Sequence, residues 1–235
     1  MIGDAATRDH PVLVDRVQAA RGDSGARLVV IGAAEEGAGL DPDLHLPAPR
    51  AALAPLLRGL LLHCRDAGLV DAQGLARGVA APDGFWDALR PGHDIWSVAR
   101  ACGLAPQLVR DFYDLWAADA RALSLFGGKD AAVAAAALNL HVATGRIGRP
   151  GAGPFALGRA ANGMGAREVG CLADTLAAHR DFTPDSIVDA QRFWGARTMA
   201  QAPGLEGEAL LQAIRDGAVR ALISIGDEAG AMDWL

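Results

Sequence analysis

Apolar positions recur with two spacings along the chain, and the two spacings predict alternating helices and strands. In residues 10–22, apolar side chains return every three to four positions, which is the spacing of one helical face. Apolar runs that end in glycine, such as residues 26–32, are typical of buried parallel strands. The same reasoning predicts strands at 26–32, 43–46, 121–128 and 219–226, and helices at 10–22, 51–67, 106–119, 129–145, 166–179, 183–193 and 206–216.

The alternation of helices with short apolar strands predicts the architecture of the chain. It is typical of an α/β fold with a mostly parallel sheet and flanking helices, in a Rossmann-like arrangement. We expect residues 1–145 to form this α/β domain. Residues 146–235 should add a glycine-rich loop, further helices and a last strand that pack on it rather than fold alone. In such sheets, ligands bind at the carboxyl ends of the strands.

Composition narrows the class of protein. Of the 235 residues, 51% are hydrophobic and 21% are charged, and no stretch is long and apolar enough to span a membrane. A net charge of -6 with scattered arginines excludes a nucleic-acid binder, which needs a concentrated basic face. The three cysteines and six histidines lack the spacings of a metal site, so we predict no metal ligand and no catalytic residue. The sparse cysteines and the absence of a signal-like pattern lead us to expect a cytoplasmic protein.

Residues 144–155, TGRIGRPGAGPF, combine four glycines, two prolines and two arginines. Backbone rich in glycine can pass very close to a ligand, and arginines beside glycine amides can form an anion-binding concavity. The alternative is a solvent-facing loop whose charges serve solubility. Together with the stretch NGMGAREVG that follows, the candidate cofactor- or anion-binding residues are Thr144, Gly145, Arg146, Arg149, Gly151, Asn162, Gly165, Arg167 and Glu168.

We expect this loop to be ordered without a ligand, because prolines lower the entropy of the unfolded chain. Its predicted anchors are Ile147, Pro150, Pro154 and Phe155. The loop should pack against residues 162–170, with Arg146, Arg149 and Arg167 facing one concavity. Arginines without partners would take an anion such as sulfate, phosphate or nitrate. Neutralisation by Glu168 or another carboxylate would instead leave a structural remnant, which is the outcome we expect.

The sequence around the loop resembles that of assimilatory nitrate reductases. ALNLHVATGRIGRPGAGPF, NGMGAREVG and LAAHRDF carry the likeness, and HPVLVDRVQAA, GARLVVIG, DLHLPAP, GLLLHCRDAGLVD, RFWG and ALISIG extend it over most of the chain. These enzymes belong to the dimethyl sulfoxide reductase superfamily. The resemblance implies a bis-molybdopterin guanine dinucleotide cofactor, reduction of nitrate to nitrite, and a four-cysteine iron–sulfur site near the N-terminus. The chain matches only the central α/β portion of such an enzyme.

The positions at which this family holds its nucleotide differ in this chain. G-x-N-P motifs, whose asparagine contacts the cofactor, read GDAA at residues 3–6 and GDEA at 226–229. The nucleotide-holding D-P-R corresponds to GAA at 32–34, the guanine-reading G-T-D to AAL at 51–53, and a polar cofactor-lining stretch to GGK at 127–129. Each polar group left unpaired in a binding site costs roughly 1–3 kcal/mol. The resemblance therefore implies that cofactor binding is weakened here.

From these departures we expect a non-catalytic homologue of molybdopterin-dependent nitrate reductase that acts by binding another protein chain or by self-association. No cofactor is expected on the isolated chain, and no nucleic-acid or membrane partner. Candidate contact surfaces are Trp194, Trp234 and the alanine-rich segment 133–140. One alternative is a subunit of a molybdopterin-dependent oxidoreductase that shares a molybdopterin guanine dinucleotide site with another polypeptide. The other is a binder of small anions.

Overall fold

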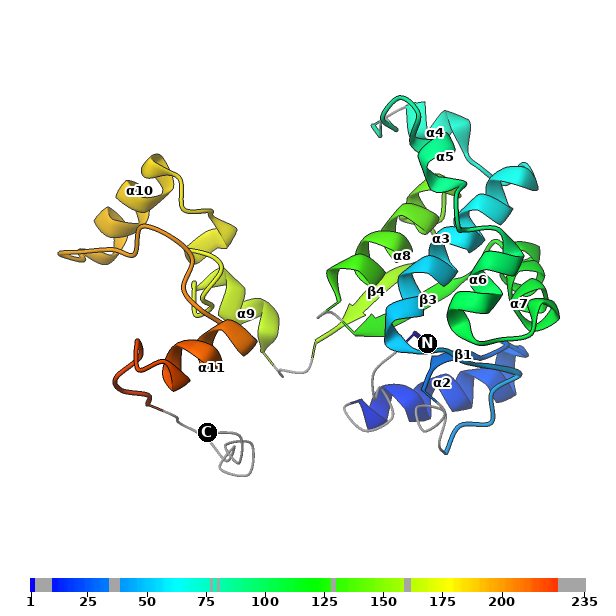
Figure 1. The fold of residues 1–235 in the computed structure, drawn as a ribbon, viewed down its shortest axis with the longest axis horizontal. Coiled ribbons are helices and arrows are strands. Elements are labelled where there is room, and N and C mark those ends of the chain that lie inside the picture. Colours follow the sequence, from blue (N-terminus) through cyan, green and yellow to red (C-terminus); the bar gives the residue numbers. More distant parts are fainter. Residues whose placement is uncertain are drawn as a thin grey trace. The chain divides into compact units, whose positions relative to one another are not determined.

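The chain divides into two units, Met1–Arg159 and Ala160–Leu235. The computed structural model describes residues 1–2, 10–33, 39–76, 78–79, 81–127, 130–158 and 162–223 (Figure 1). The first unit contains α2 (Pro11–Ser24), β1 (Val29–Gly32), β2 (Leu44–Pro47), α3 (Arg50–Asp66), α4 (Ala72–Ala76), α5 (Phe85–Leu89), α6 (Ile95–Cys102), α7 (Pro106–Ala118), β3 (Leu123–Gly127), α8 (Ala131–Ala143) and β4 (Gly153–Leu157). The second contains α9 (Gly163–Glu168), the 3-10 turn η2 (Ala177–His179), α10 (Pro184–Trp194) and α11 (Gly207–Arg215).

The strands of the first unit form two parallel pairs that meet at Ile2. β1 pairs with β2, and β3 pairs with β4. Ile2 makes parallel bridges to Ile31 on one side and to Phe126 on the other, which gives the order β2-β1-Ile2-β3-β4. The main-chain bonds at this junction join Ile2 N to Leu125 O at 2.8 Å and Ile31 N to Met1 O at 2.9 Å. The predicted α/β fold with parallel strands is confirmed.

A proline lies at an outward-facing position on each outer edge of this sheet. In β2, the N–H groups of Leu44 and Ala48 donate toward β1, so Pro47 between them faces away from β1. In β4, Gly153 N donates toward the chain entering β3, so the nitrogen of Pro154 faces outward. Proline has no N–H to offer a further strand. Both outer edges of the described sheet are therefore poor templates for pairing.

The core of the first unit lies between the sheet and the helices α3, α6, α7 and α8. In Figure 1, α3 and α8 run alongside each other next to β3 and β4, in agreement with their contacts. α3 is buried along most of its length, and its Leu56 carbonyl accepts a hydrogen bond from the Tyr113 hydroxyl of α7 at 2.8 Å. Beneath these helices, paired positions across the sheet form a buried row made of Leu46, Ile31, Ile2 and Phe126.

Three short helices and one strand of the first unit were not predicted. α6 had recognisable signals, because Asp94 accepts the N–H groups of Trp96 and Ser97 and Gly103 ends the helix in a left-handed conformation. β4 begins with Gly153 and a proline, two residue types that weigh against a strand. α4 and α5 have only five residues each, too few for a helical period to stand out.

Two predictions for the second unit are wrong. The predicted helix 166–179 ends early at Glu168, because Gly170 has a φ of +70° and the N–H of Cys171 turns back to Ala166 O at 2.8 Å. Instead of a strand starting at Val219, residues 219–223 are irregular, and the N–H of Val219 donates to Ala213 O at the end of α11. The rest of that predicted strand lies outside the described residues.

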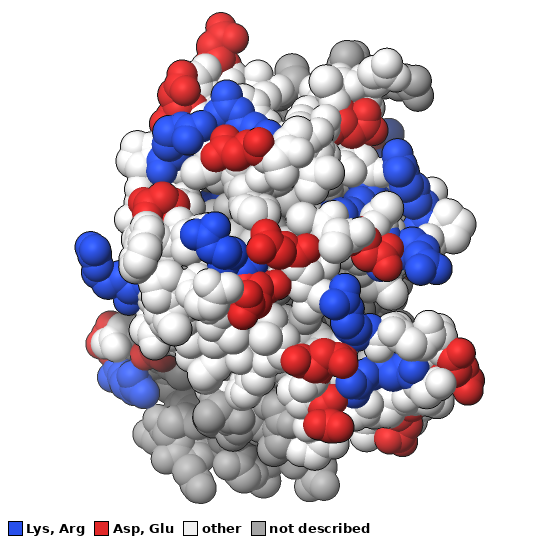
Figure 2. Space-filling view, turned by 90° about the vertical axis from the view of Figure 1, so that its right-hand side faces the viewer, with Lys and Arg blue, Asp and Glu red and all other residues white. Residues whose placement is uncertain are grey.

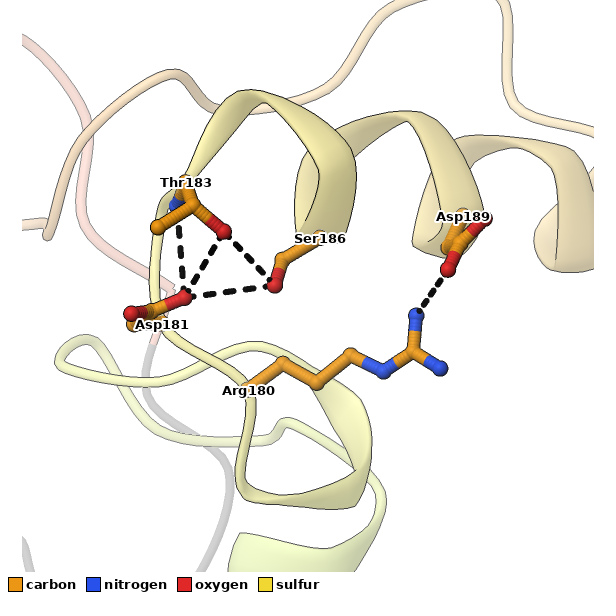
Figure 3. Close-up of polar contacts among 5 residues, drawn as sticks. All are labelled: Arg180, Asp181, Thr183, Ser186 and Asp189. Carbon is orange, nitrogen blue, oxygen red and sulfur yellow. Dashed lines mark hydrogen bonds and ion pairs between the residues drawn. The ribbon is translucent and has the colours of Figure 1, made fainter.

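The second unit has a small core of Leu176, Ile187 and Ala190. Polar contacts organise the start of α10, where Asp181 Oδ1 accepts from the Thr183 hydroxyl at 3.0 Å and the Ser186 hydroxyl at 3.2 Å (Figure 3). These hydrogen bonds lower the pKa of Asp181, and the bond from the Thr183 hydroxyl has the largest effect. No helix among the described residues of either unit has the length and apolar character needed to cross a membrane.

Replacing Gly59 by alanine tests the packing of α3 on α7. A Cβ there would collide with the Tyr113 hydroxyl and lie 2.9 Å from Val98 Cγ2. We therefore expect Gly59→Ala to lower the free energy of unfolding by about 1–3 kcal/mol. Gly22→Ala in α2 is the matched control, because nothing lies within 4 Å of a Cβ there and alanine favours a helix by about 1 kcal/mol. Urea denaturation measures both variants, and equal stabilities would contradict the tight contact.

Candidate functional site

The glycine-rich loop begins where α8 ends and leads into β4. The Thr144 hydroxyl donates to Leu140 O at 2.7 Å, and Gly145 then adopts a φ of +63°. Gly145 lies against Asp71, since a Cβ there would be 3.0 Å from Asp71 Cβ and closer still to the carboxylate. The N–H of Asp71 also donates to Ala143 O at 2.8 Å. The close approach that this glycine permits is therefore made by a protein carboxylate.

Arg146 is a buried anchor of the loop. Its residue is only 5% exposed, and its guanidinium carbon lies 3.6 Å from the centre of the Trp116 ring. Nη2 donates to Asp119 O at 2.7 Å and to Trp116 O at 3.4 Å. Burial, more than any neighbouring charge, lowers the pKa of this guanidinium. We expected Arg146 to face a concavity, and instead it is packed on the end of α7.

The other loop residues are exposed or contact the protein. Arg149 Nη2 lies 3.9 Å from Asp71 Oδ2, a long ion pair with a mostly exposed arginine. Gly151 lies beside the Arg121 side chain. Ile147 and Phe155, two of the predicted anchors, are 49% and 50% exposed, so the loop depends on Arg146 more than on apolar contacts.

The remaining candidates belong to the second unit. Arg167 pairs with Asp174 at 3.6 Å. The Asn162 side chain lies over Gly165, where a Cβ would collide with its amide. Glu168 is exposed, and the carboxylates paired with Arg149 and Arg167 are Asp71 and Asp174 instead. The packing of the loop against residues 162–170, with Arg149 and Arg167 facing one concavity, stays a prediction, whereas Arg146 is buried at the end of α7.

A buried polar pair lies behind the loop. His141 Nε2 is 2.8 Å from Ser124 Oγ, and both residues are buried between α8 and β3. The His141 ring meets the Trp116 ring edge-on, with 5.6 Å between centres. Burial, followed by the charge of Arg146, lowers the pKa of His141 to about 4, so this histidine is neutral at pH 7. The spacing of the six histidines predicted no metal site, and it gave no sign that His141 meets Ser124.

The described residues offer little to a metal ion or a polyanion. They contain no group of three or more His, Cys, Asp or Glu that could hold a metal. Cys64 and Cys102 are buried, and burial raises the pKa of Cys64 to about 11. Figure 2 shows acidic and basic side chains interspersed over one face of the molecule.

Comparison with known proteins shows which proteins the chain resembles. No family model matches the chain. It is 40% identical to a nitrate reductase of Klebsiella oxytoca over 96% of its own length, and 30% identical to a nitrate reductase of Shewanella frigidimarina over 96%. The chain is a partial nitrate reductase-like protein. It spans only 26% and 25% of the length of these relatives.

The likeness extends to a wider group of molybdopterin oxidoreductase-like proteins. A probable oxidoreductase of Bacillus subtilis is 25% identical over 99% of the chain, which spans 24% of that protein. An assimilatory nitrate reductase of Haloferax mediterranei is 31% identical over 74% of the chain, and the match covers 24% of that protein's length. The resemblance seen in the loop sequences thus holds for nearly the whole chain.

The nitrate reductase-like loop can be tested for its fit to the anionic cofactor that the resemblance implies. Three groups that could meet a pyrophosphate are otherwise engaged, because the Thr144 hydroxyl bonds to α8, Arg146 is buried, and Arg149 lies beside Asp71. The Asp71 carboxylate against Gly145 would repel a phosphate. In this structure these three groups are held by contacts within the first unit. The positions corresponding to both G-x-N-P motifs, and also Ala34, residues 128–129 and Trp234, lie outside the described residues.

Arg146 and Arg149 form a matched pair for testing which arginine holds the loop. Arg146→Met removes the stack on Trp116 and leaves two carbonyls without their charged donor. We expect it to lower the free energy of unfolding by about 2–4 kcal/mol. Arg149→Met should change it by less than about 0.5 kcal/mol, because exposed ion pairs contribute little. Thermal and urea denaturation measure both, and an Arg146→Met protein as stable as the wild type would contradict the anchoring role.

The buried histidine predicts a dependence of stability on pH. An unfolded histidine titrates near 6.5, whereas the pKa of His141 in the folded protein is about 4. Between these values the unfolded chain binds the proton more readily, so the free energy of unfolding should fall as the pH falls from 6.5 to 4. The full difference corresponds to roughly 3 kcal/mol.

His141→Gln is the control for this prediction, because glutamine does not titrate. In the variant, the free energy of unfolding should depend less steeply on pH between pH 4 and 6.5, because the contribution of His141 is absent. The α-amino group of Met1, whose pKa burial lowers to about 5, contributes a slope of the same sign in both proteins and cancels in the comparison. Identical slopes in denaturation curves taken across this range would refute the burial of a neutral His141.

Proposed function

We propose that this chain is a non-catalytic member of the nitrate reductase-like proteins that acts by binding another protein chain. Leu53 carries the proposal. It stands where the resemblance implies a guanine-reading aspartate, and it is 4% exposed within the hydrophobic core of the first unit. A side chain buried among apolar residues cannot hydrogen-bond a base edge. The engaged arginines of the glycine-rich loop support the same proposal.

Exposed apolar side chains support a protein partner. Phe193 at the end of α10 is 86% exposed, and its neighbour Trp194 is also exposed. Large apolar side chains grouped on a surface favour protein–protein contact. The alanine-rich segment 133–140 is a poorer candidate than we expected, because Val133 and Leu140 are buried in α8. The proposed contact surface is therefore the C-terminal end of α10.

Metal and pterin analysis tests the loss of the cofactor. We expect the protein purified from a molybdopterin-competent host to carry no stoichiometric molybdenum, tungsten or iron. The reason is that several lost polar contacts, at roughly 1–3 kcal/mol each, would weaken binding by orders of magnitude. A full-length nitrate reductase expressed in the same host is the control. About one molybdenum per chain, with release of a pterin, would overturn the proposal.

A second candidate is a subunit that shares a molybdopterin guanine dinucleotide site with another polypeptide. The observation that favours it is the likeness to nitrate reductases over 96% of the chain, glycine-rich loop included. Co-expression with the remaining portion of the Klebsiella oxytoca relative tests it. A stable complex that contains molybdenum would support this candidate, whereas a stable complex without molybdenum would support the non-catalytic protein binder.

Anion titration tests the third possibility, a binder of small anions. We expect no binding of nitrate or phosphate by calorimetry to the wild type, because Arg149 lies beside Asp71. Arg149→Ala is the test variant, and Arg215→Ala on α11 is the control because it too is an exposed, paired arginine. Salt-sensitive binding that is lost in Arg149→Ala and kept in Arg215→Ala would show a working anion site.

A further inference from the structure

The two faces of the sheet in the first unit are covered differently. Successive side chains of a strand point to opposite faces of the sheet. On β3, Ser124 meets His141 of α8 and Phe126 lies in the hydrophobic core, so both strand residues point toward the helices. Leu123 and Leu125 alternate with them and therefore point to the other face of the sheet.

Pairing with β4 extends this second face. Leu125 lies opposite Phe155, so the two side chains share a face, and Leu157 follows two residues later on the same side. The Phe155 ring lies back over Gly153, the partner of Leu123, because an added Cβ on that glycine would be 3.3 Å from the ring. Together, Leu123, Leu125, Phe155 and Leu157 form an apolar half-face on β3 and β4.

The apolar half-face is exposed, whereas the same face of the sheet is buried at β1. Leu123 and Phe155 are 54% and 50% exposed, and the other two side chains are partly exposed. Val30 of β1 shares this face, because its neighbour Ile31 points into the core, and Val30 is only 3% exposed. Parallel sheets are almost always covered on both faces. The half of this face at β3 and β4 is therefore open to a further element.

The surroundings of the apolar half-face restrict what can cover it. Pro47 and Pro154 disfavour a strand added at either outer edge, so the face itself is the more accessible side of the sheet. The elements that cover the faces of parallel sheets are α-helices, which present a stripe of apolar side chains. Aliphatic and aromatic side chains without charge match such a stripe and not a charged ligand.

We propose that the apolar half-face binds an amphipathic helix from the portion of a nitrate reductase-like polypeptide that lies outside the match to this chain. The match covers 26% and 25% of the nitrate reductases of Klebsiella oxytoca and Shewanella frigidimarina, so most of each polypeptide is available to supply the helix. The surface lies on the first unit and differs from the end of α10. The inference rests on the proposed function only in requiring a bound protein chain, and not on the loss of the cofactor.

Hydroxyl-radical footprinting of the wild-type chain tests this surface. The chain is oxidised alone and after co-expression with the remaining portion of the Klebsiella oxytoca relative. Oxidation of Leu123 and Phe155 should be at least about fivefold slower in the complex, because the centre of an interface excludes water. Val12 of α2, which is 70% exposed, is the control and should be oxidised equally in both samples.

A double variant tests the same surface by affinity. Leu123→Thr with Phe155→Thr removes apolar area and keeps residue types that suit a strand. It should weaken the complex by at least about tenfold, whereas Val12→Thr should leave the dissociation constant unchanged. Denaturation of the uncomplexed variant verifies its folding. If the double variant does not fold, the footprint of the wild-type chain decides.

The outcomes separate this inference from the proposed function. A complex that is weakened by Phe193→Ser, with Leu123 and Phe155 oxidised as in the free chain, would overturn the inference and leave the proposed function standing. The absence of any complex would overturn both. Protection of Leu123 and Phe155 in the chain alone would also overturn the inference, because this chain or a second copy of it would then cover the apolar half-face.

Discussion

A buried guanidinium stacked on an indole ring holds two parts of the first unit together. Arg146 comes from the loop after α8, and Trp116 and Asp119 come from the end of α7. A charge taken out of water must be hydrogen-bonded. The carbonyls at the end of α7 satisfy this requirement, so the loop and α7 are positioned by the same bonds. Because Arg146 is buried in these contacts, its bonded guanidinium nitrogen is not available to a ligand.

Asp71 completes this arrangement from the opposite side of the loop. It contacts Gly145, accepts the N–H of Gly74 at 2.9 Å to begin α4, and lies beside Arg149. The backbone conformation that glycine allows is thus used for packing between protein segments. The same residues that make the sequence similar to nitrate reductases serve, in this unit, to hold its own loop.

Periodic apolar patterning was enough to predict the core elements. α3 and β1 were predicted within a few residues, because long apolar runs allow few alternatives. β4 was missed because its stability comes from pairing with β3, and its own glycine and proline oppose a strand. The composition of the loop marked it as unusual, but its arginine contacts could not be predicted. The acceptors of Arg146 lie 27 and 30 residues earlier in the chain, and no local pattern reports such distant contacts.

The two prolines on the outer edges of the sheet limit how this protein can associate. With Pro47 and Pro154 at outward positions, each edge of the described sheet lacks one of the N–H donors that a ladder into a neighbouring molecule would use. Growth into a fibre through these edges is therefore disfavoured even at high protein concentration. Backbone pairing, which accepts almost any extended segment, is disfavoured at these edges. Recognition of a partner through side chains, which can distinguish one sequence from another, is favoured in its place.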